Sequence, residues 1–421
     1  MAALDNRSTQ ELAQEFKPYI VSWNVTGQCN LLCPHCYIDA KERALGDLST
    51  KQAKGVIDGL YELNENLMLV LSGGEPMLRD DIYELVEYSA NRGFITVMGS
   101  NGTLLTKDKL KRLRDAGLKG VGISIDSVSS SYHDSFRLFY GAWNLSMSAL
   151  RFAKEVGIET QVDITVTDRN YKEIDKFVDM AVELGSKAVN FFFLVCTGRA
   201  MKGFISTENY EAALNKIVRL SDSEKRIMVR ARCAPHIYRI LHEDKVHIPQ
   251  GTRGCLAGRT YMRIDPVGNI TACPYMPDVL GNVKEDSIVD IWMHSKKLAV
   301  LRDGLYKGRC GRCEYTEICG GCRARALAMH GNFMEEDPLC LYEPSGQEKV
   351  TVKAIPEGDF QSSIKWDDDA RERMKRVPAF MKKMIVGLIE KKAAEKGITV
   401  ITSEFVKEMK SKDYAKIHEG E

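Results

Sequence analysis

Residues 19–37 read YIVSWNVTGQCNLLCPHCY, an apolar segment followed directly by three closely spaced cysteines. The apolar part, residues 19–27, is typical of a buried strand, and an amphipathic helical pattern follows at residues 51–63. The same alternation continues to about residue 200. Further strands are predicted at residues 66–74, 94–100, 120–126, 158–167 and 186–195, and further helices at 80–93, 106–116, 141–156 and 170–184.

Six strands that alternate with helices and are nearly continuous in apolar residues predict an α/β fold with a parallel sheet covered by helices. Crossovers between parallel strands are right-handed, so the sheet is expected to curl into a partial (β/α)6 barrel of the TIM type. Active residues in such folds lie at the carboxyl ends of the strands. The three cysteines follow the first strand and are therefore expected at that mouth of the barrel.

Cys29, Cys33 and Cys36 are suited to hold three irons of a 4Fe–4S cluster, because cysteine thiolate is the standard ligand of such clusters. Three ligands leave one iron open to bind and activate another molecule, so the arrangement predicts a catalytic cluster. The alternative is a zinc site that is completed by a distant ligand such as His35.

The spacing of these cysteines, with Tyr37 directly after the last, resembles that of the radical S-adenosylmethionine (radical SAM) enzymes. Residues 72–76, SGGEP at the end of the second predicted strand, resemble a second motif of that family. The resemblance implies that the open iron binds the amino and carboxylate groups of SAM. Reductive cleavage would then yield methionine and a 5′-deoxyadenosyl radical that abstracts hydrogen from a substrate.

The resemblance also implies a set of SAM-binding residues at the strand ends. Glu75 and the backbone of Gly73 and Gly74 would receive the methionine ammonium group, since glycines permit close backbone approach. Arg137 would contact the methionine carboxylate. Tyr37 and Leu194 would flank the adenine, although both residue types are more often ordinary packing at a strand end. The remaining polar groups, expected near the ribose and carboxylate, are Ser100, Asn101, Ser124 and Asp126.

A second group of cysteines lies between residues 250 and 345 and resembles the SPASM extension of radical SAM enzymes, which binds auxiliary iron–sulfur clusters. By this resemblance one fully ligated cluster would be held by Cys310, Cys313, Cys319 and Cys340. Candidates for a second auxiliary cluster are Cys255, Cys273 and Cys322. Its fourth ligand could be Cys233, or the site could be open or empty, so one or two auxiliary clusters are expected.

This chain departs from the family pattern in having two residues, rather than three, between Cys319 and Cys322. Zinc is an alternative occupant of the group formed by Cys310, Cys313, Cys319 and Cys322, although two such close pairs are crowded compared with a zinc ribbon. Cys196 stands apart from both groups and is expected to be a buried, small hydrophobic residue.

Residues 255–277 and 310–340 resemble one SPASM branch, whose members decarboxylate or remove side chains of iron tetrapyrroles in heme and heme d1 biosynthesis. Arg323 and Arg325 could pair with substrate carboxylates, or they could form structural ion pairs. Residues 366–421 resemble the small C-terminal domain of light-independent protochlorophyllide reductase subunits, which favours a tetrapyrrole substrate. The main alternative is a peptide- or protein-modifying maturase like the sulfatase maturases, and a remote one is a non-enzymatic iron–sulfur electron carrier.

The composition is that of a soluble protein with more than one domain. The chain has 421 residues, twelve cysteines and a net charge of +1, which gives no indication of nucleic-acid or membrane partners. The N-terminus lacks an apolar signal core, and the longest apolar stretch, residues 188–196, is shorter than the roughly 20 residues that cross a bilayer. We therefore expect a cytoplasmic enzyme with reduced cysteines, supplied with electrons by a donor such as ferredoxin or flavodoxin.

The expected domain boundaries follow from shifts in composition along the chain. The parts are an N-terminal extension (1–16), the radical SAM barrel (17–205), a connector (206–249), the SPASM domain (250–345), a linker (346–365) and a small helical domain (366–421).

Overall fold

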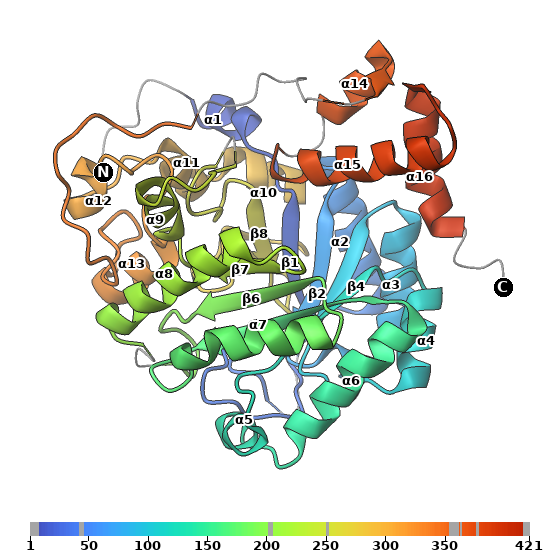
Figure 1. Ribbon diagram of the computed structural model, residues 1–421, viewed down its shortest axis with the longest axis horizontal. Coiled ribbons are helices and arrows are strands. Elements are labelled where there is room, and N and C mark those ends of the chain that lie inside the picture. Colours follow the sequence, from blue (N-terminus) through green and yellow to red (C-terminus); the bar gives the residue numbers. More distant parts are fainter. Residues whose placement is uncertain are drawn as a thin grey trace. The chain divides into compact units, whose positions relative to one another are not determined.

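The computed structural model describes residues 8–41, 46–200, 205–249, 252–352, 362, 364–375 and 379–415. The chain divides into two compact units (Figure 1). The larger unit comprises residues 1–246 and 254–350, and the smaller comprises residues 247–253 and 351–421. In the part of the chain that is described, no helix has both the length and the apolar character that crossing a membrane requires.

The core of the larger unit is the predicted run of six parallel strands, which pair in sequence order. These strands are β1 Ile20–Thr26, β2 Met68–Gly73, β3 Ile95–Ser100, β4 Gly120–Ser124, β5 Glu159–Val166 and β6 Ala188–Phe193. All six lie within the segments predicted as strands, so the α/β fold with a partial barrel is confirmed.

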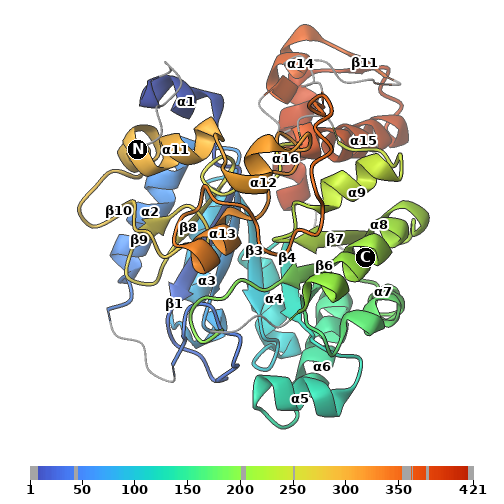
Figure 2. The same cartoon turned by 90° about the vertical axis from the view of Figure 1, so that its left-hand side faces the viewer.

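Helices connect these strands and lie along the outer face of the sheet (Figures 1 and 2). Helix α2 shows why they begin where they do: the Ser49 side chain accepts from the Gln52 N–H, and Gln52 bonds back to the Ser49 backbone, which closes a capping box. The helices of this part are α2 Thr50–Leu63, α3 Ile82–Asn91, α4 Lys107–Asp115, α5 Ser130–Arg137, α6 Ala142–Val156 and α7 Ile174–Glu183, with 3-10 turns η1 Pro76–Leu78 and η2 Tyr171–Glu173.

The sheet extends beyond the predicted barrel at both edges. At one edge, residues expected only as a connector form α8 Thr207–Ser223, β7 Met228–Arg232 and α9 Ile237–Glu243, and β7 pairs in parallel with β6. At the other edge, β8 Tyr261–Ile264 pairs in parallel with β1. The sequence of residues 261–274, with turn residues at Pro266–Asn269, is typical of a hairpin, and β8 pairs antiparallel with β9 Asn269–Thr271 as that pattern predicts. With β10 Gly281–Asn282, ten strands of the described chain form one sheet.

The two faces of this sheet differ in chemistry. Trp23, Leu71, Ile123 and Phe191, which share the helix-covered face, are fully buried. The strand register places polar and small residues on the opposite face, which we call the polar face. This alternation was not read from the sequence, where the strands looked almost continuously apolar. The polar face includes Ser22, Asn24, Ser72, Gly99, Gly122, Ser124, Asp163, Asn190, Arg230, Arg232 and Arg263.

The cysteine-rich part of the larger unit is mainly loops and short helices: α10 Ile288–His294, α11 Lys296–Asp303, α12 Gly308–Arg312 and α13 Arg323–His330. Helices α10 and α11 pack against the N-terminal helix α1 Thr9–Glu15. A tryptophan stabilises this contact, since the Trp292 indole N–H donates to the Phe16 carbonyl at 3.0 Å.

The smaller unit holds α14 Asp368–Lys375, α15 Ala379–Glu395 and α16 Ser403–Ala415. It also contains two short parallel strands, β11 Lys365–Trp366 and β12 Val400–Ile401, which the sequence analysis did not predict. Its apolar core includes Trp366, Met374, Ile389 and Phe405. The residues expected as a linker fall partly outside the described chain.

Candidate functional site

Cys29, Cys33 and Cys36 lie in the loop that follows β1, at its carboxyl end as predicted. The loop is closed by a pair of backbone bonds between residues 27–29 and Lys41. Backbone N–H groups approach two of the sulfurs: Leu31 N lies 3.4 Å from Cys29 Sγ, and Ala40 N lies 3.4 Å from Cys36 Sγ. Such N–H···S contacts stabilise thiolates and tune bound clusters, so the donor set fits an iron–sulfur cluster.

The glycines of the SGGEP segment are needed for packing against this cysteine loop. A Cβ on Gly74 would lie 1.9 Å from the Gln28 carbonyl oxygen, and one on Gly73 would lie 2.5 Å from that of Thr26. Gly73 also has a φ of +140°, which side-chain-bearing residues rarely adopt. The two glycines therefore permit close packing against the end of β1 and the cysteine loop, and their approach to SAM stays a prediction.

Glu75 is fully buried and ties the ends of β2 and β3 together. Its carboxylate accepts from Ser100 Oγ at 2.9 Å and from the Asn101 backbone N–H at 2.9 Å. Asn101 in turn places its side-chain Nδ2 at 3.9 Å from Cys29 Sγ. Three predicted SAM-binding residues are thus brought together beside the first cysteine. Binding of the methionine ammonium by Glu75 stays a prediction.

Asp126 and Arg137, also predicted from the resemblance, form a buried ion pair at 2.7 Å. Burial alone would raise the pKa of Asp126, but the Arg137 guanidinium, together with His35 and His133, outweighs it and the pKa falls to about 2. The Arg137 carbonyl lies 3.8 Å from Cys33 Sγ, so this pair supports the second cysteine. Contact between Arg137 and the methionine carboxylate stays a prediction.

The other predicted residues lie around the same mouth. Ser124 ends β4 on the polar face, and Leu194 directly follows β6; both are half-buried. The Tyr37 hydroxyl accepts from Asn24 Nδ2 at 2.7 Å, and its ring lies 5.2 Å from that of Tyr275. His35, the alternative zinc ligand, stacks on Phe136 with 4.4 Å between ring centroids.

Gly198 and Arg199 hold the cysteine loop from the β6 side, which the sequence analysis missed. Arg199 Nε donates to the Cys33 carbonyl at 2.9 Å, and its Nη1 donates to the Ala40 carbonyl at 2.6 Å. A Cβ on Gly198 would lie 2.5 Å from the Cys36 carbonyl oxygen. The pair follows Cys196 in a loop where the regular sequence pattern ends, so no local signal marked it.

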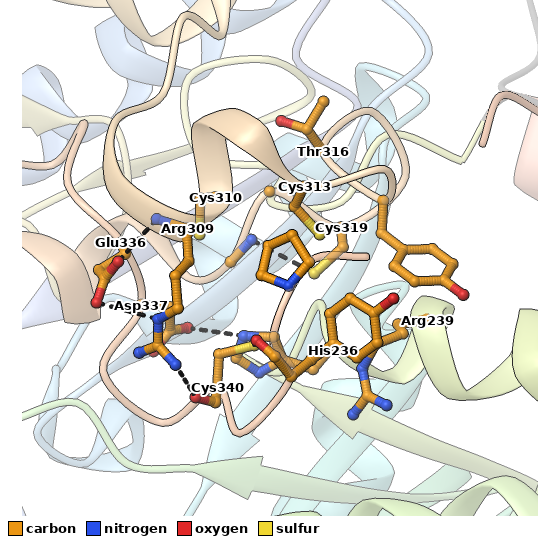
Figure 3. Close-up of a pocket in the computed structure, with 15 residues that line it drawn as sticks. His236, Arg239, Arg309, Cys310, Cys313, Thr316, Cys319, Glu336, Asp337 and Cys340 are labelled. Atoms are coloured by element: carbon orange, nitrogen blue, oxygen red, sulfur yellow. Dashed lines mark hydrogen bonds and ion pairs between the residues drawn. The ribbon is translucent and has the colours of Figure 1, made fainter. Parts of the chain in front are cut away.

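The four cysteines assigned to the first auxiliary cluster line one cavity, which is partly open to solvent (Figure 3). They are Cys310, Cys313, Cys319 and Cys340. Two donors approach the sulfurs: Gly321 N lies 3.5 Å from Cys319 Sγ, and Arg323 Nη2 lies 3.5 Å from Cys310 Sγ. This set of thiols around a shared space fits a fully ligated cluster.

The remaining SPASM cysteines form a second group with Cys233, which follows β7. Burial raises the pKa of the Cys273 thiol, and the nearby thiols of Cys233, Cys255 and Cys322 raise it further, so the four thiols are neighbours. Cys233 has a φ of +57°, a strained backbone conformation for a residue with a side chain. Cys233 is thus close enough to the other three thiols to be the fourth ligand, and that assignment stays a prediction.

Asp337 connects the two auxiliary groups, and nothing in the sequence pattern marked it. One carboxylate oxygen accepts from the Cys322 backbone N–H at 2.7 Å, and Arg325 Nε donates to the other at 2.7 Å. The His236 ring lies 3.5 Å away. Burial alone would raise the pKa of Asp337, but Arg325 and His236 hold it well below its ordinary value.

Arg323 and Arg325 are buried, which favours the second of the two roles considered for them, a structural one. Arg325 is almost fully buried in its ion pair with Asp337. Arg323 is also buried and donates to the carbonyls of Phe333 and Glu335. Both guanidinium groups are therefore used inside the cysteine-rich part of the chain.

Comparison with known proteins agrees with this geometry. Family models match the chain for the radical SAM superfamily at residues 23–181, for the SPASM iron–sulfur cluster-binding domain at 255–323 and for the proto-chlorophyllide reductase 57 kD subunit at 366–410. These matches define a radical SAM enzyme with a SPASM domain. Its cofactors are accordingly SAM, a 4Fe–4S cluster and auxiliary iron–sulfur.

The chain belongs to the radical SAM family that contains AdoMet-dependent heme synthase. The enzyme of that name from Methanosarcina barkeri is 36% identical over 347 residues, which cover 79% of this chain and 99% of the relative. The one from Oleidesulfovibrio alaskensis is 38% identical, covering 77% of this chain and 87% of the relative. Pre-heme d1 synthase of Dinoroseobacter shibae is 29% identical, with coverages of 77% and 86%.

Solved structures show the same fold. SuiB of Streptococcus suis, bound to its precursor peptide SuiA, superposes with a TM-score of 0.64 at 17% identity, covering 77% of this chain and 76% of SuiB. The structure titled anSMEcpe with bound AdoMet gives a TM-score of 0.58 at 17% identity, covering 76% and 93%.

Proposed function

We propose that this protein modifies side chains of an iron tetrapyrrole in heme-type cofactor biosynthesis, by decarboxylating or removing them. The identity to AdoMet-dependent heme synthases, which extends over nearly the whole length of one of them, is the observation that carries this proposal. The bound cluster and SAM supply a radical able to abstract hydrogen from an unactivated C–H bond. The chain's own residues fix where that chemistry happens.

The roles of those residues follow from their contacts. Cys29, Cys33 and Cys36 would hold the catalytic cluster, in a loop kept in place by Gly74 on one side and Arg199 on the other. Glu75 joins the β2 and β3 ends beside Cys29, and the Asp126–Arg137 pair supports the loop near Cys33. The polar face of the sheet would then surround SAM and the substrate.

The test of this proposal is product analysis under anaerobic conditions. Reduced, cluster-containing protein with SAM and iron coproporphyrin is expected to form 5′-deoxyadenosine and a porphyrin lighter by one formic acid per modified propionate. Sirohaem derivatives, screened in parallel, would report removal of acetate side chains. Formation of 5′-deoxyadenosine with no change in any tetrapyrrole would contradict the proposed substrate class while leaving radical SAM chemistry intact.

A peptide- or protein-modifying maturase is the second candidate, supported by the fold shared with peptide-bound SuiB. That likeness, at 17% identity, carries less weight than 36% identity to a heme synthase.

All twelve cysteines are free thiols. This suits an enzyme of the reducing cytoplasm that takes electrons from a ferredoxin or flavodoxin, which we propose as its setting.

We further propose two auxiliary clusters, one held by the cavity-lining cysteines and one by Cys233, Cys255, Cys273 and Cys322. Cys340→Ala and Cys233→Ala are each expected to lose one cluster and to retain the N-terminal cluster. Iron and sulfide analysis with Mössbauer spectroscopy measures this.

The matched control is Cys196→Ala, since Cys196, which is half-buried rather than buried as predicted, belongs to none of the three groups. It is expected to retain every cluster. If Cys340→Ala or Cys233→Ala kept the full iron content of the wild type, that ligand assignment would be wrong.

A further inference from the structure

Three arginines stand on the polar face at the two edges of the parallel sheet. Arg230 and Arg232 are on β7, and Arg263 is on β8. Strands β7 and β8 are the outermost strands of the parallel part of the sheet, which curls into a partial barrel whose interior is lined by the polar face. Arginines that are distant along the sheet therefore face a common interior.

Arg232 and Arg263, which we call the edge arginines, are held in the same way. Arg263 Nε donates to the Asn24 amide oxygen at 2.6 Å, and Arg232 Nε donates to that of Asn190 at 3.2 Å. The two asparagines are only 0% and 1% exposed.

Each asparagine is itself fixed by its Nδ2 group. That of Asn24 donates to the Tyr37 hydroxyl at 2.7 Å, and that of Asn190 donates to Asp163 at 2.8 Å. Both amide oxygens are thereby aimed at the arginines, so the guanidinium groups are oriented by buried polar partners rather than by chance surface contacts.

In the part of the chain that is described, the edge arginines form no direct ion pair; Asp163, whose charge interacts with that of Arg232, is separated from it by Asn190. Within the described residues, no carboxylate lies at ion-pair distance from Arg230, Arg232 or Arg263, and the Nη nitrogens of the edge arginines donate to no protein group. Burial and the neighbouring Arg232 lower the pKa of Arg230 to about 10, which shows how closely like charges are gathered on β7. Partly buried cations without an anion are unfavourable, and an anionic ligand would relieve this cost.

We propose that the edge arginines, assisted by Arg230, bind carboxylate side chains of the substrate from two sides of the barrel interior. This inference rests on the proposed function, because a tetrapyrrole carries several carboxylates around its rim. A guanidinium group held at Nε still offers Nη donors to a carboxylate. Two arginines on facing edges suit a ligand whose carboxylates are far apart. Contacts to the carboxylate side chains that do not react would fix the position of the side chain that does react.

The experiment compares Arg232→Gln and Arg263→Gln with wild type, with the iron clusters reconstituted and SAM present. Binding of iron coproporphyrin, followed by its absorbance, is expected to weaken about ten-fold for each substitution. A porphyrin whose propionates are esterified should bind wild type and both variants with the same affinity. Iron content and cluster absorbance equal to those of wild type report that both variants are folded and carry their clusters, and SAM affinity is measured in parallel.

Arg226→Gln is the matched control, because Arg226 precedes β7 and pairs with Glu224 in an exposed position. It should bind the porphyrin as wild type does. Equal porphyrin affinity in wild type and the edge-arginine variants would overturn this inference alone, and weakened SAM binding would show that these arginines serve the SAM carboxylate instead. If wild type bound no iron porphyrin, the proposed function would fail and this inference with it.

Discussion

Gly74→Ala is expected to yield protein that lacks the N-terminal iron–sulfur cluster and forms no 5′-deoxyadenosine. The added methyl carbon would lie 1.9 Å from the Gln28 carbonyl oxygen and 3.0 Å from the Cys29 Cβ. A backbone atom cannot move aside as a flexible side chain can, so the cysteine loop itself must shift. Three ligands that have to surround one cluster do not tolerate such a shift.

The measurement is iron content and the electron paramagnetic resonance spectrum of the reduced, anaerobically purified variant. The control is Gly55→Ala within α2, where the added Cβ would meet no atom within 4 Å. That change should retain all clusters and stabilise the helix by about 0.5–1 kcal/mol. A Gly74→Ala protein with wild-type cluster content and activity would show that the SGGEP segment does not position the cysteine loop.

Asp337→Asn is expected to lower the free energy of unfolding by about 3–5 kcal/mol, the usual cost of removing one partner from a buried ion pair. The substitution leaves the buried Arg325 without its counter-charge and weakens the bond that fixes the Cys322 backbone. Because Asp337 touches elements of both auxiliary groups, iron should be lost from both of them rather than from one. Denaturant unfolding, followed by fluorescence and by cluster absorbance together, measures the two effects.

Glu343→Gln is a suitable comparison, since Glu343 is an exposed carboxylate that pairs with Arg309 in the same part of the chain. Its substitution should change the free energy of unfolding by less than about 1 kcal/mol. Similar small losses in Asp337→Asn and Glu343→Gln would mean that Asp337 does not organise the auxiliary groups.

The sequence was sufficient for those features that local patterns encode. Each strand from β1 to β6 follows from a short apolar run between helical patterns, and the hairpin of β8 and β9 follows from its turn. The family resemblance, the SPASM segment and the tetrapyrrole relatives were predicted from motifs and are confirmed by the comparisons. The roles of the individual SAM-binding residues stay predictions.

Other features depend on contacts between residues that are far apart in the sequence. Arg199 is 166 residues from Cys33, and Arg263 is 239 residues from Asn24, so no local pattern could link them. Strand β7, with the sequence MVRAR, is short and charged because it forms a sheet edge beside an open interior. Arg323 and Arg325 were open to two interpretations because a sequence does not reveal burial. Their burial in the structure favours a structural role.

Hydrogen transfer from the substrate is the most direct test of the central claim that a SAM-derived radical acts on a tetrapyrrole side chain. The protein should be incubated with SAM and an iron coproporphyrin that is deuterated on the propionate carbons, and the 5′-deoxyadenosine should then be analysed by mass spectrometry. Deuterium in the 5′-deoxyadenosine, matched by an altered porphyrin side chain, is the expected result. Unlabelled 5′-deoxyadenosine beside an unchanged porphyrin would contradict the account.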